Sequence, residues 1–349
     1  MKELRVLVTA CGCPGASTLI KYLKGIKERS ITIIGTDMDP EAIGRFFADK
    51  FYCVPPAIDP EYIPRIKEIC NTEKIDVILP ESSSQVYKFA QAKPSFENIG
   101  VKVVVSDPEP IRLANNKFLM YETLRKKTKL NLPQYTWPKT LPDFIQDAEL
   151  LGYPAKPICF KPHEAKGSRG FRILDSSISR KDLLLNYKPN NRYMTLEEFI
   201  TIFENESDFP KLILMEYIPG EEITSDCLCL NGEALLTAVK SVEQARWGVI
   251  VRGELLEEPM IIQQTSIILQ QIPLSYNTNL QFIKPPDQEP LLIEINPRVS
   301  TFIYQQDLVQ PYLSIKLALG EETPDSIKSY QEKITIGRRM VRYMDQVFF

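Results

Sequence analysis

Short apolar segments alternate with helical segments over the first 105 residues, and this alternation restricts the folds open to the chain. The pattern predicts strands at 4–10, 31–36, 76–79 and 101–105, with helices near 17–27 and 83–92. Strands separated by helices are typical of a parallel sheet covered by helices on both faces. We therefore expect a doubly wound α/β domain at about residues 1–110.

The first strand-to-helix turn contains Gly12 and Gly15, and the next strand ends at Asp37. This is the general layout of a dinucleotide-binding fingerprint. Pro14, however, removes one backbone N–H from the would-be phosphate cradle. A structural turn is at least as well supported, and an NAD-dependent oxidoreductase stays open as an alternative.

Composition excludes several classes of protein. The chain has 349 residues, of which 25% are charged, and a net charge of −3, so no basic surface is expected to capture nucleic acid. No run of about 18 apolar residues could span a bilayer, and the N-terminus lacks the apolar segment of a secretory signal. We expect a cytoplasmic protein of about two domains that binds neither nucleic acid nor membrane.

The cysteines and the histidine do not suggest catalysis. Seven cysteines form no C-x-x-C pair, and the one histidine is His163. A zinc site or a Ser-His-Asp triad would have almost nothing to be built from. We expect the cysteines to be small core residues and His163 to face solvent in a loop.

The sequence pattern changes after an extended segment marked by Pro133 and Pro138. Strands are predicted at 158–162 and 170–174, around a loop that contains Gly167 and Gly170 and follows Lys161. A lysine before a glycine-containing loop can hold phosphates, although an ordinary β-hairpin explains the same pattern equally well. An antiparallel meander over 212–240, around the turn Asn231-Gly232, comes next.

The stretch from Leu291 to Ser300 concentrates polar side chains at the end of an apolar strand. Glu294, Asn296 and Arg298 should project the same way, because side chains two apart share a face of a strand. The preceding strand, 279–284, brings Gln281 beside them. Carboxylate and amide oxygens suit Mg²⁺, and a guanidinium suits phosphate or carboxylate. An edge strand whose polar residues face water is the structural alternative.

Taken in order, these residues resemble the ATP-grasp superfamily. The ordered set consists of Lys117, Lys161, Glu216, Glu222, Gln281, Glu294, Asn296 and Arg298. The likeness is strongest to the synthetase domains of the carbamoyl-phosphate synthetase large subunit, where E-x-N-P-R-V-S follows N-x-Q-F. This chain has Asn279-Leu-Gln-Phe282 and then Glu294-Ile-Asn-Pro-Arg-Val-Ser300.

The resemblance implies a mixed α/β and α+β fold. A pre-ATP-grasp, Rossmann-like, doubly wound domain at 1–110 would precede a two-subdomain ATP-grasp domain at 111–349, with a lid at about 127–220. Mg-ATP would bind between the two subdomains.

The resemblance also assigns roles to individual residues. Lys117 and Lys161 would contact ATP phosphates, with Lys161 and Arg298 counted as catalytic. The remaining nucleotide-binding residues would be Gly167, Ser168, Glu216, Tyr217, Ile218 and Glu222. Gln281, Glu294 and Asn296 would ligate Mg²⁺, with Mn²⁺ as an alternative metal. Lys240 and Arg246 lie where a cation could contact substrate, although their sequence context is better explained if they are ordinary exposed residues of a strand and a turn.

The activity implied is ADP-forming ligation. A small carboxylate would be activated as an acylphosphate and attacked by an amine or a thiol, which requires positioning and charge neutralisation more than a nucleophilic side chain. Two alternatives from other classes stay open: a non-catalytic nucleotide-binding protein, and a split carbamoyl-phosphate synthetase fragment that needs a partner chain. The acid, the acceptor and the oligomeric state, including a homodimer, are not determined by the sequence.

Overall fold

The computed structural model describes residues 2–164, 170–188, 192–246, 249–300 and 308–349. The chain forms two compact units. Unit 1 comprises Met1–Asn115, Glu222–Phe282 and Glu294–Phe349, and unit 2 comprises Asn116–Glu221 and Ile283–Ile293. Each unit is described by itself. The domain limits expected from the sequence stay a prediction, since unit 1 combines the N-terminal residues with the C-terminal sheet.

The first sheet of unit 1 is parallel and five-stranded, as the alternating pattern predicts. Its strands are β1 (Leu4–Thr9), β2 (Ile31–Asp37), β3 (Lys50–Cys53), β4 (Val77–Pro80) and β5 (Lys102–Val103). They are ordered β3-β2-β1-β4-β5. The connecting helices are α1 (Ala16–Lys24), α2 (Tyr62–Glu73) and α3 (Ser83–Glu97), with a 3-10 turn at Ile43–Phe46. The prediction of a doubly wound domain is confirmed.

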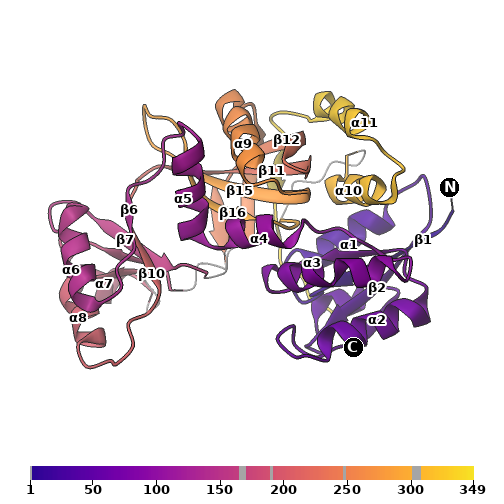
Figure 1. Cartoon of the computed structure of the whole chain (residues 1–349), viewed down its shortest axis with the longest axis horizontal. Helices are drawn as coiled ribbons and strands as arrows, with labels where there is room; N and C mark the ends of the chain where they lie inside the picture. The colour runs from indigo at the N-terminus through magenta and orange to yellow at the C-terminus, as the bar shows by residue number, and fades with distance from the viewer. Residues whose placement is uncertain (1, 165–169, 189–191, 247–248, 301–307) are drawn as a thin grey trace. The chain divides into compact units, whose positions relative to one another are not determined.

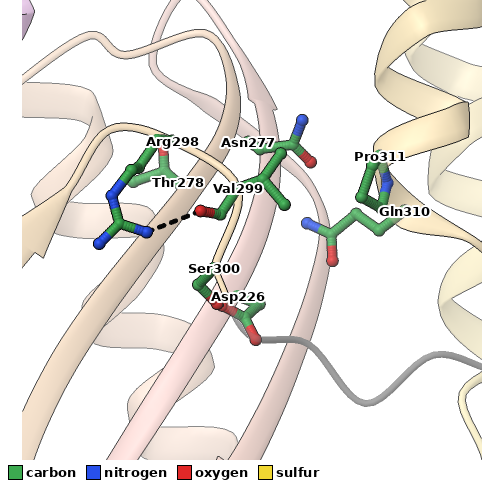
Figure 2. A pocket seen from close by; sticks show the side chains of 8 residues that line it. All are labelled: Asp226, Asn277, Thr278, Arg298, Val299, Ser300, Gln310 and Pro311. Carbon is green, nitrogen blue, oxygen red and sulfur yellow. Dashed lines mark hydrogen bonds between the residues drawn. The ribbon is translucent and has the colours of Figure 1, made fainter. Parts of the chain in front are cut away.

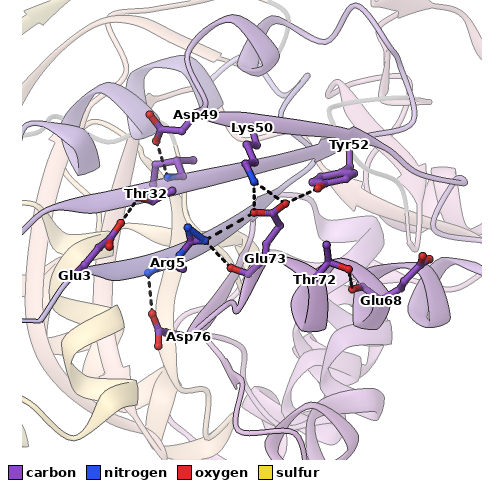
Figure 3. Close-up of polar contacts among 11 residues, drawn as sticks. Glu3, Arg5, Thr32, Asp49, Lys50, Tyr52, Glu68, Thr72, Glu73 and Asp76 are labelled. Atoms are coloured by element: carbon purple, nitrogen blue, oxygen red, sulfur yellow. Dashed lines mark hydrogen bonds and ion pairs between the residues drawn. The ribbon is translucent and has the colours of Figure 1, made fainter.

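A buried carboxylate ties this sheet to α2 (Figure 3). Glu73, at the end of α2, is 4% exposed and accepts hydrogen bonds from Lys50 Nζ at 2.8 Å and Tyr52 Oη at 2.5 Å. The Arg5 guanidinium donates to the Glu73 backbone carbonyl at 2.8 Å. These donors hold the pKa of Glu73 below its ordinary value, with the Lys50 hydrogen bond as the largest cause. Glu73 therefore links α2 to β3 through its carboxylate and to β1 through its backbone carbonyl.

The segment from residue 108 to residue 127 forms two helices, not one continuous helix. They are α4 (Pro108–Asn115) and α5 (Lys117–Lys127). The break falls at Asn116, whose backbone is extended and whose side chain accepts a hydrogen bond from the Leu119 backbone N–H. Asparagine competes with helical backbone bonding in this way, and so caps a new helix instead of continuing the old one.

The C-terminal sheet of unit 1 is mainly antiparallel. Its order is β13-β14-β12-β11-β15-β16, with β17 pairing β14. The strands are β11 (Glu221–Leu230), β12 (Glu233–Ser241), β13 (Gln244–Arg246), β14 (Val249–Leu256), β15 (Tyr276–Lys284), β16 (Leu291–Asn296) and β17 (Arg339–Val341). β11 and β12 meet at the expected turn, where Asn231 and Gly232 have φ of 48° and 86°. Positive φ at both positions matches a type I′ hairpin.

Helices surround this sheet within unit 1. They are α9 (Pro259–Gln271), which packs on β12, α10 (Gln310–Leu319) and α11 (Pro324–Lys328), followed by a 3-10 turn at Ser329–Lys333 (Figure 1). Val6 of β1, Ala238 of β12 and Ile315 of α10 belong to one continuous hydrophobic core. The N-terminal sheet and the C-terminal sheet therefore share a core, which fixes the edge of one against the other.

Unit 2 contains its own sheet and its own core. The sheet order is β6-β10-β7-β8-β9, formed by β6 (Tyr135–Thr136), β7 (Ile158–Pro162), β8 (Arg172–Leu174), β9 (Tyr193–Met194) and β10 (Leu212–Glu216). Besides α5, its helices are α6 (Leu141–Leu150), α7 (Arg180–Asn186) and α8 (Leu196–Phe203). Phe144 of α6 stacks on Phe199 of α8 at 3.9 Å between ring centroids, beside Phe160 of β7. This aromatic cluster packs α6 and α8 against the sheet.

The cysteines are mostly core residues, as the sequence predicts. Cys11, Cys70, Cys159, Cys227 and Cys229 are buried. Cys13 is half-buried and Cys53 is exposed, so the expectation is wrong for Cys53. Among the described residues no helix is long and apolar enough to cross a membrane.

Candidate functional site

Two amides of the expected metal-binding set meet at one asparagine. Gln281 on β15 and Asn296 on β16 lie on neighbouring strands. Gln281 Nε2 and Asn296 Nδ2 lie 3.4 Å and 3.5 Å from Asn279 Oδ1. Because each amide nitrogen is directed at Asn279, each amide oxygen is turned away from it. Glu294, half-buried, lies two residues before Asn296 and so on the same face of β16.

A buried ion pair anchors Asn279. Asp226 accepts a hydrogen bond from Asn279 Nδ2 at 3.0 Å, and also from Ser300 Oγ. The partner of Asp226 is Lys240, whose side chain is fully buried. Burial is the largest influence on Lys240 and lowers its pKa. Lys240 was expected to be an exposed strand residue, and the structure corrects this.

The physical reason for that correction lies in the pairing of β11 with β12. The register places Thr224 opposite Lys240 and Asp226 opposite Ala238. The carboxylate and the ammonium therefore come from diagonal positions of the hairpin, within reach of a long side chain. Arg246, by contrast, is exposed on β13.

Arg298 leaves β16 and reaches the first sheet. Its Nε donates to Ser83 Oγ at 2.8 Å, and its Nη1 donates to the Val299 carbonyl at 2.8 Å. Ser83 is the first residue of α3, directly beyond the carboxyl end of β4. The guanidinium is thereby held at the carboxyl edge of the parallel sheet.

A small pocket lies beside Arg298 (Figure 2). It has room for about one water molecule and is lined by residues that include Asp226, Asn277, Thr278, Arg298, Ser300 and Gln310. Figure 2 shows Asp226 and Ser300 side by side, with Gln310 reaching in from the start of α10. Gln310 is 2% exposed, and its Oε1 has no hydrogen-bond partner among the described residues. The pocket is therefore lined with polar groups next to the metal-ligand candidates.

Lys117 and Lys161 lie in unit 2. Lys117 begins α5 and is 3% exposed, and its backbone N–H donates to the His163 carbonyl at 3.1 Å. Lys161 is on β7, and its Nζ donates to the Ile293 carbonyl at 3.1 Å. The hydrogen bond to His163 places the start of α5 next to the end of β7, so both lysines belong to the same part of unit 2.

The residues expected at the base and the ribose run from the end of β10 to the start of β11. Glu216 Oε1 accepts from the Gln134 backbone N–H at 2.8 Å, which fixes the carboxylate against β6. Tyr217 and Ile218 are half-buried. Gly220 follows, where an added Cβ would lie 2.5 Å from the Lys284 carbonyl oxygen, so only glycine fits. Glu222 lies at the start of β11 in unit 1.

The glycine loop is only partly described. Gly167 and Ser168 lie outside the described residues. Gly170 has φ of +74°, and a Cβ there would lie 2.7 Å from Pro162 Cδ, so glycine is required where the chain returns to β8. Among the ranges that the structure describes, no three His, Cys, Asp or Glu residues gather as a metal cluster.

His163 and Asp37 differ from simple surface residues. The His163 side chain is 17% exposed and packs on Trp137 at 5.2 Å between ring centroids. The expectation that it faces solvent is therefore wrong.

Asp37 accepts a hydrogen bond from the Gly12 backbone N–H at 2.7 Å, and a Cβ on Gly12 would lie 3.0 Å from the same oxygen. The acid at the end of β2 therefore stabilises the first turn, which favours the structural explanation of the glycines over a dinucleotide site.

Sequence reasoning missed three residues near these groups. Asn279 and Asp226 are both 4% exposed, and the alternation of Asn279 with Gln281 on one strand face could have identified the first. Glu81 is 6% exposed directly after β4. The sequence pattern that could have identified Glu81 is an acidic residue directly after a fully apolar strand.

Two protein families match the chain. Residues 208–338 match the family described as ATP-grasp in the biosynthetic pathway with Ter operon. Residues 6–104 match the PylC-like N-terminal domain.

Among curated proteins, the chain is similar to carbamoyl phosphate synthase large chains. It is 23% identical over 294 residues to that of Buchnera aphidicola, covering 79% of this chain and 24% of the relative. It is 24% identical over 303 residues to that of Agathobacter rectalis, covering 82% and 25%. The chain spans about a quarter of the length of these relatives.

Two solved structures share its fold. The first is the biotin carboxylase domain of 2-oxoglutarate carboxylase from Hydrogenobacter thermophilus in complex with MgADP and bicarbonate. It matches with a TM-score of 0.67 at 18% identity, covering 96% of this chain and 73% of that one. The second is N5-carboxyaminoimidazole synthetase from Staphylococcus aureus with ADP. It matches with a TM-score of 0.62 at 14% identity, covering 92% and 78%.

The family matches and the shared fold support an ATP-grasp synthetase fold for this chain, preceded by an N-terminal domain that resembles the PylC-like one. Within the ATP-grasp superfamily it resembles a synthetase domain of the carbamoyl phosphate synthase large chain. The expected superfamily and fold class are both confirmed.

Proposed function

We propose that this protein is an ADP-forming ligase that activates a small carboxylate with Mg-ATP. The carboxylate oxygen would attack the γ-phosphorus, and the bond to the bridging oxygen would break to give an acylphosphate and ADP. An amine or a thiol would then attack the acyl carbon and displace phosphate, losing one proton. Positioning and charge neutralisation provide most of the catalysis in phosphoryl transfer.

The observation that carries the proposal is the set of oxygen donors on β15 and β16. Asn279 engages the amide nitrogens of Gln281 and Asn296, so both amide oxygens face away from it. Glu294 shares the strand face with Asn296. Oxygen donors of this kind suit Mg²⁺ or Mn²⁺, and these residues would hold the ion. When bound, Mg²⁺ would neutralise charge on the phosphates.

The remaining roles follow from the chemistry of each side chain. Lys117 and Lys161 would supply positive charge to the phosphates as compact ammonium groups. Arg298, a planar guanidinium held by Ser83, would face the substrate carboxylate and the transferred phosphoryl group. We extend the proposal to the base and ribose contacts at Glu216, Tyr217, Ile218 and Glu222, and to phosphate contacts at Gly167 and Ser168.

ADP formation by the purified chain tests the proposal. The chain would be incubated with Mg-ATP and panels of carboxylic acids, amino acids, bicarbonate, amines and thiols, and ADP and phosphate would be measured. We expect ADP release that depends on an added acid. Nucleotide binding without turnover for every acid and acceptor would instead support a non-catalytic nucleotide-binding protein. Turnover that appears only with a second polypeptide would support a partner-dependent fragment.

Glu294→Ala is the decisive variant. We expect ADP formation to fall by about 100-fold or more, since a carboxylate that can bridge metal ions is lost. The control is Glu289→Ala, which removes an exposed carboxylate from the connection between β15 and β16. Circular dichroism and the unfolding midpoint should match the wild type for both variants. Near-normal ADP formation by Glu294→Ala would refute the assigned role.

A further inference from the structure

Glu81 occupies the position in the first sheet where ligands bind in open α/β folds. The strand order β3-β2-β1-β4-β5 reverses direction between β1 and β4. Ligands in such sheets bind in the crevice outside the carboxyl ends of the strands at this reversal. Glu81 directly follows Pro80, the last residue of β4, and Cys11-Gly12-Cys13 follows β1 across the reversal.

The Glu81 carboxyl group is buried without enough hydrogen-bond donors. The residue is 6% exposed, and its Oε1 has no hydrogen-bond partner among the described residues. Burial raises the pKa of Glu81 to about 8, while the charge of Arg298 acts to lower it. A buried polar atom without a partner is uncommon in native proteins and marks a place where a ligand or ordered water can supply the missing bond.

The other acidic groups around Glu81 are either hydrogen-bonded or neutral. Asp37 accepts backbone N–H groups from Gly12 at 2.7 Å and from Asp39 at 3.0 Å. Burial raises the pKa of Cys13 to about 11 and that of Cys11 to about 12, so both thiols stay neutral. Glu81 is therefore the acidic group at this edge that can still receive a donor.

Arg298 adds the opposite charge to the same edge. Its Nε donates to Ser83 Oγ at 2.8 Å. Ser83 is two residues after Glu81 in the chain, so this hydrogen bond holds the guanidinium near the end of β4. A guanidinium such as that of Arg298 binds carboxylates through parallel hydrogen bonds. A buried carboxylate such as that of Glu81 can bind an ammonium group. One edge of unit 1 thus presents the two groups that recognise the two ends of a zwitterion.

We propose that Glu81 binds the ammonium group of an amino-acid substrate whose carboxylate faces Arg298. This rests on the proposed ligase function and narrows its substrate class from any small acid to one that carries a positively charged amine. The bound ammonium group would stay protonated and would not be the nucleophile. Bicarbonate or a simple acid would leave the Glu81 carboxyl group without a donor.

Binding and turnover with matched acids test this assignment. The probes are both enantiomers of the common amino acids and their counterparts without the amino group, such as L-alanine with propionate and L-glutamate with glutarate, together with bicarbonate. Three proteins would be compared: wild type, Glu81→Gln, and the control Glu61→Gln, which makes the same change at an exposed residue of the same domain. Mg-ATP affinity is measured separately for each.

The expected result is selective. ADP formation in the wild type should respond to amino acids and not to their amino-free counterparts. Glu81→Gln should raise the KM for the amino acid by about 30-fold or more, as expected when one partner of a buried charge pair is removed. The affinity for Mg-ATP should be unchanged, and Glu61→Gln should behave as the wild type.

A pH profile separates a binding role from a structural one. Because the ammonium group would bind the ionised carboxylate, kcat/KM for the amino acid should rise about tenfold per pH unit below pH 8 and then level off. Glu81→Gln should lose this rise, and Glu81→Asp should keep part of it.

Three results would overturn the inference. They are an equal response to amino-free acids or bicarbonate, no response to any amino acid in a protein that binds Mg-ATP, and an unchanged KM in Glu81→Gln. Failure of the wild type to bind Mg-ATP would remove the proposed function and this inference with it.

Discussion

Two buried glutamates of the first domain differ in what surrounds them. Glu73 is 4% exposed and receives hydrogen bonds from Lys50 and Tyr52, whereas Glu81 is 6% exposed and has one oxygen without a donor among the described residues. Hydrogen bonds hold the pKa of Glu73 below its ordinary value, and burial raises that of Glu81 to about 8. The two side chains have similar solvent exposure, but Glu73 has hydrogen-bond donors that outweigh its desolvation, whereas desolvation dominates at Glu81, and these two differences together set the charge states.

The difference separates a structural carboxylate from one available for binding. The donors of Glu73 come from β3, and its backbone carbonyl binds Arg5 of β1, so its carboxylate already has protein partners (Figure 3). Glu81 lies at the strand reversal and costs free energy whenever it ionises without a partner. Of the two buried acids, Glu81 is therefore the one with an oxygen that can still accept a hydrogen bond from a ligand, since Oε1 has no partner among the described residues.

The largest effect should come from removing the charge of Glu81. Its pKa rises from 4.5 to about 8 on folding, so between these pH values the native state holds a proton that the unfolded chain has released. Stability should therefore fall as the pH rises through this window, by up to about 5 kcal/mol from this group. Glu81→Gln should remove that loss. Its unfolding free energy should fall less between pH 5 and pH 9 than that of the wild type.

Urea unfolding at pH 5 and pH 9 measures this effect. The quantity to compare is the change in unfolding free energy between the two pH values, because this cancels any cost of the amide itself. Glu61→Gln, which is exposed, should retain the pH dependence of the wild type. Equal pH dependence in Glu81→Gln and the wild type would show that Glu81 has a partner and would remove the contrast with Glu73.

The opposite result is expected for Glu73→Gln. Losing the hydrogen bonds of a buried carboxylate to Lys50 and Tyr52 should destabilise the protein by about 2–3 kcal/mol at pH 7. Because the folded pKa of Glu73 is lowered, its contribution is present above the unfolded pKa and is lost as the pH falls through the folded pKa. The penalty of Glu73→Gln should therefore shrink in acid. Denaturant unfolding at pH 7 and pH 3 checks this, and a penalty independent of pH would instead indicate a loss of packing.

Much of the fold could be predicted because periodicity reports on local geometry. The alternation of apolar strands with helices gave the parallel sheet, and the polar residues at every second position of β15 and β16 gave Gln281 and Asn296 on adjoining strands. These features depend on side-chain alternation within a strand, which the sequence contains directly.

The charge state of buried residues could not be predicted in this way. Lys240 was expected to be exposed, but the register of β11 with β12 buries it beside Asp226. Glu73 ends an amphipathic helix and Glu81 follows an apolar strand, but neither context identifies the hydrogen-bond donors, which for Glu73 come from residues more than 20 positions away, such as Lys50. Such pairings depend on how segments pack, and one sequence does not contain that information.

The smallest effect should come from Lys50→Ala, which moves Glu73 one step towards the condition of Glu81. The Lys50 side chain is 56% exposed, so solvent screens the pair and its loss should cost only about 1 kcal/mol at pH 7. Tyr52 would still donate to Glu73, and Arg5 would stay 3.8 Å away. The pKa of Glu73 should rise, which moves the acid-induced loss of stability to higher pH.

The control is Lys102→Ala, which changes an exposed lysine on β5 of the same sheet and should leave the acid transition unchanged. If Lys50→Ala instead costs as much as Glu73→Gln, a single ammonium group accounts for nearly all of the difference between the two glutamates, and an ammonium group brought by a ligand could do the same for Glu81.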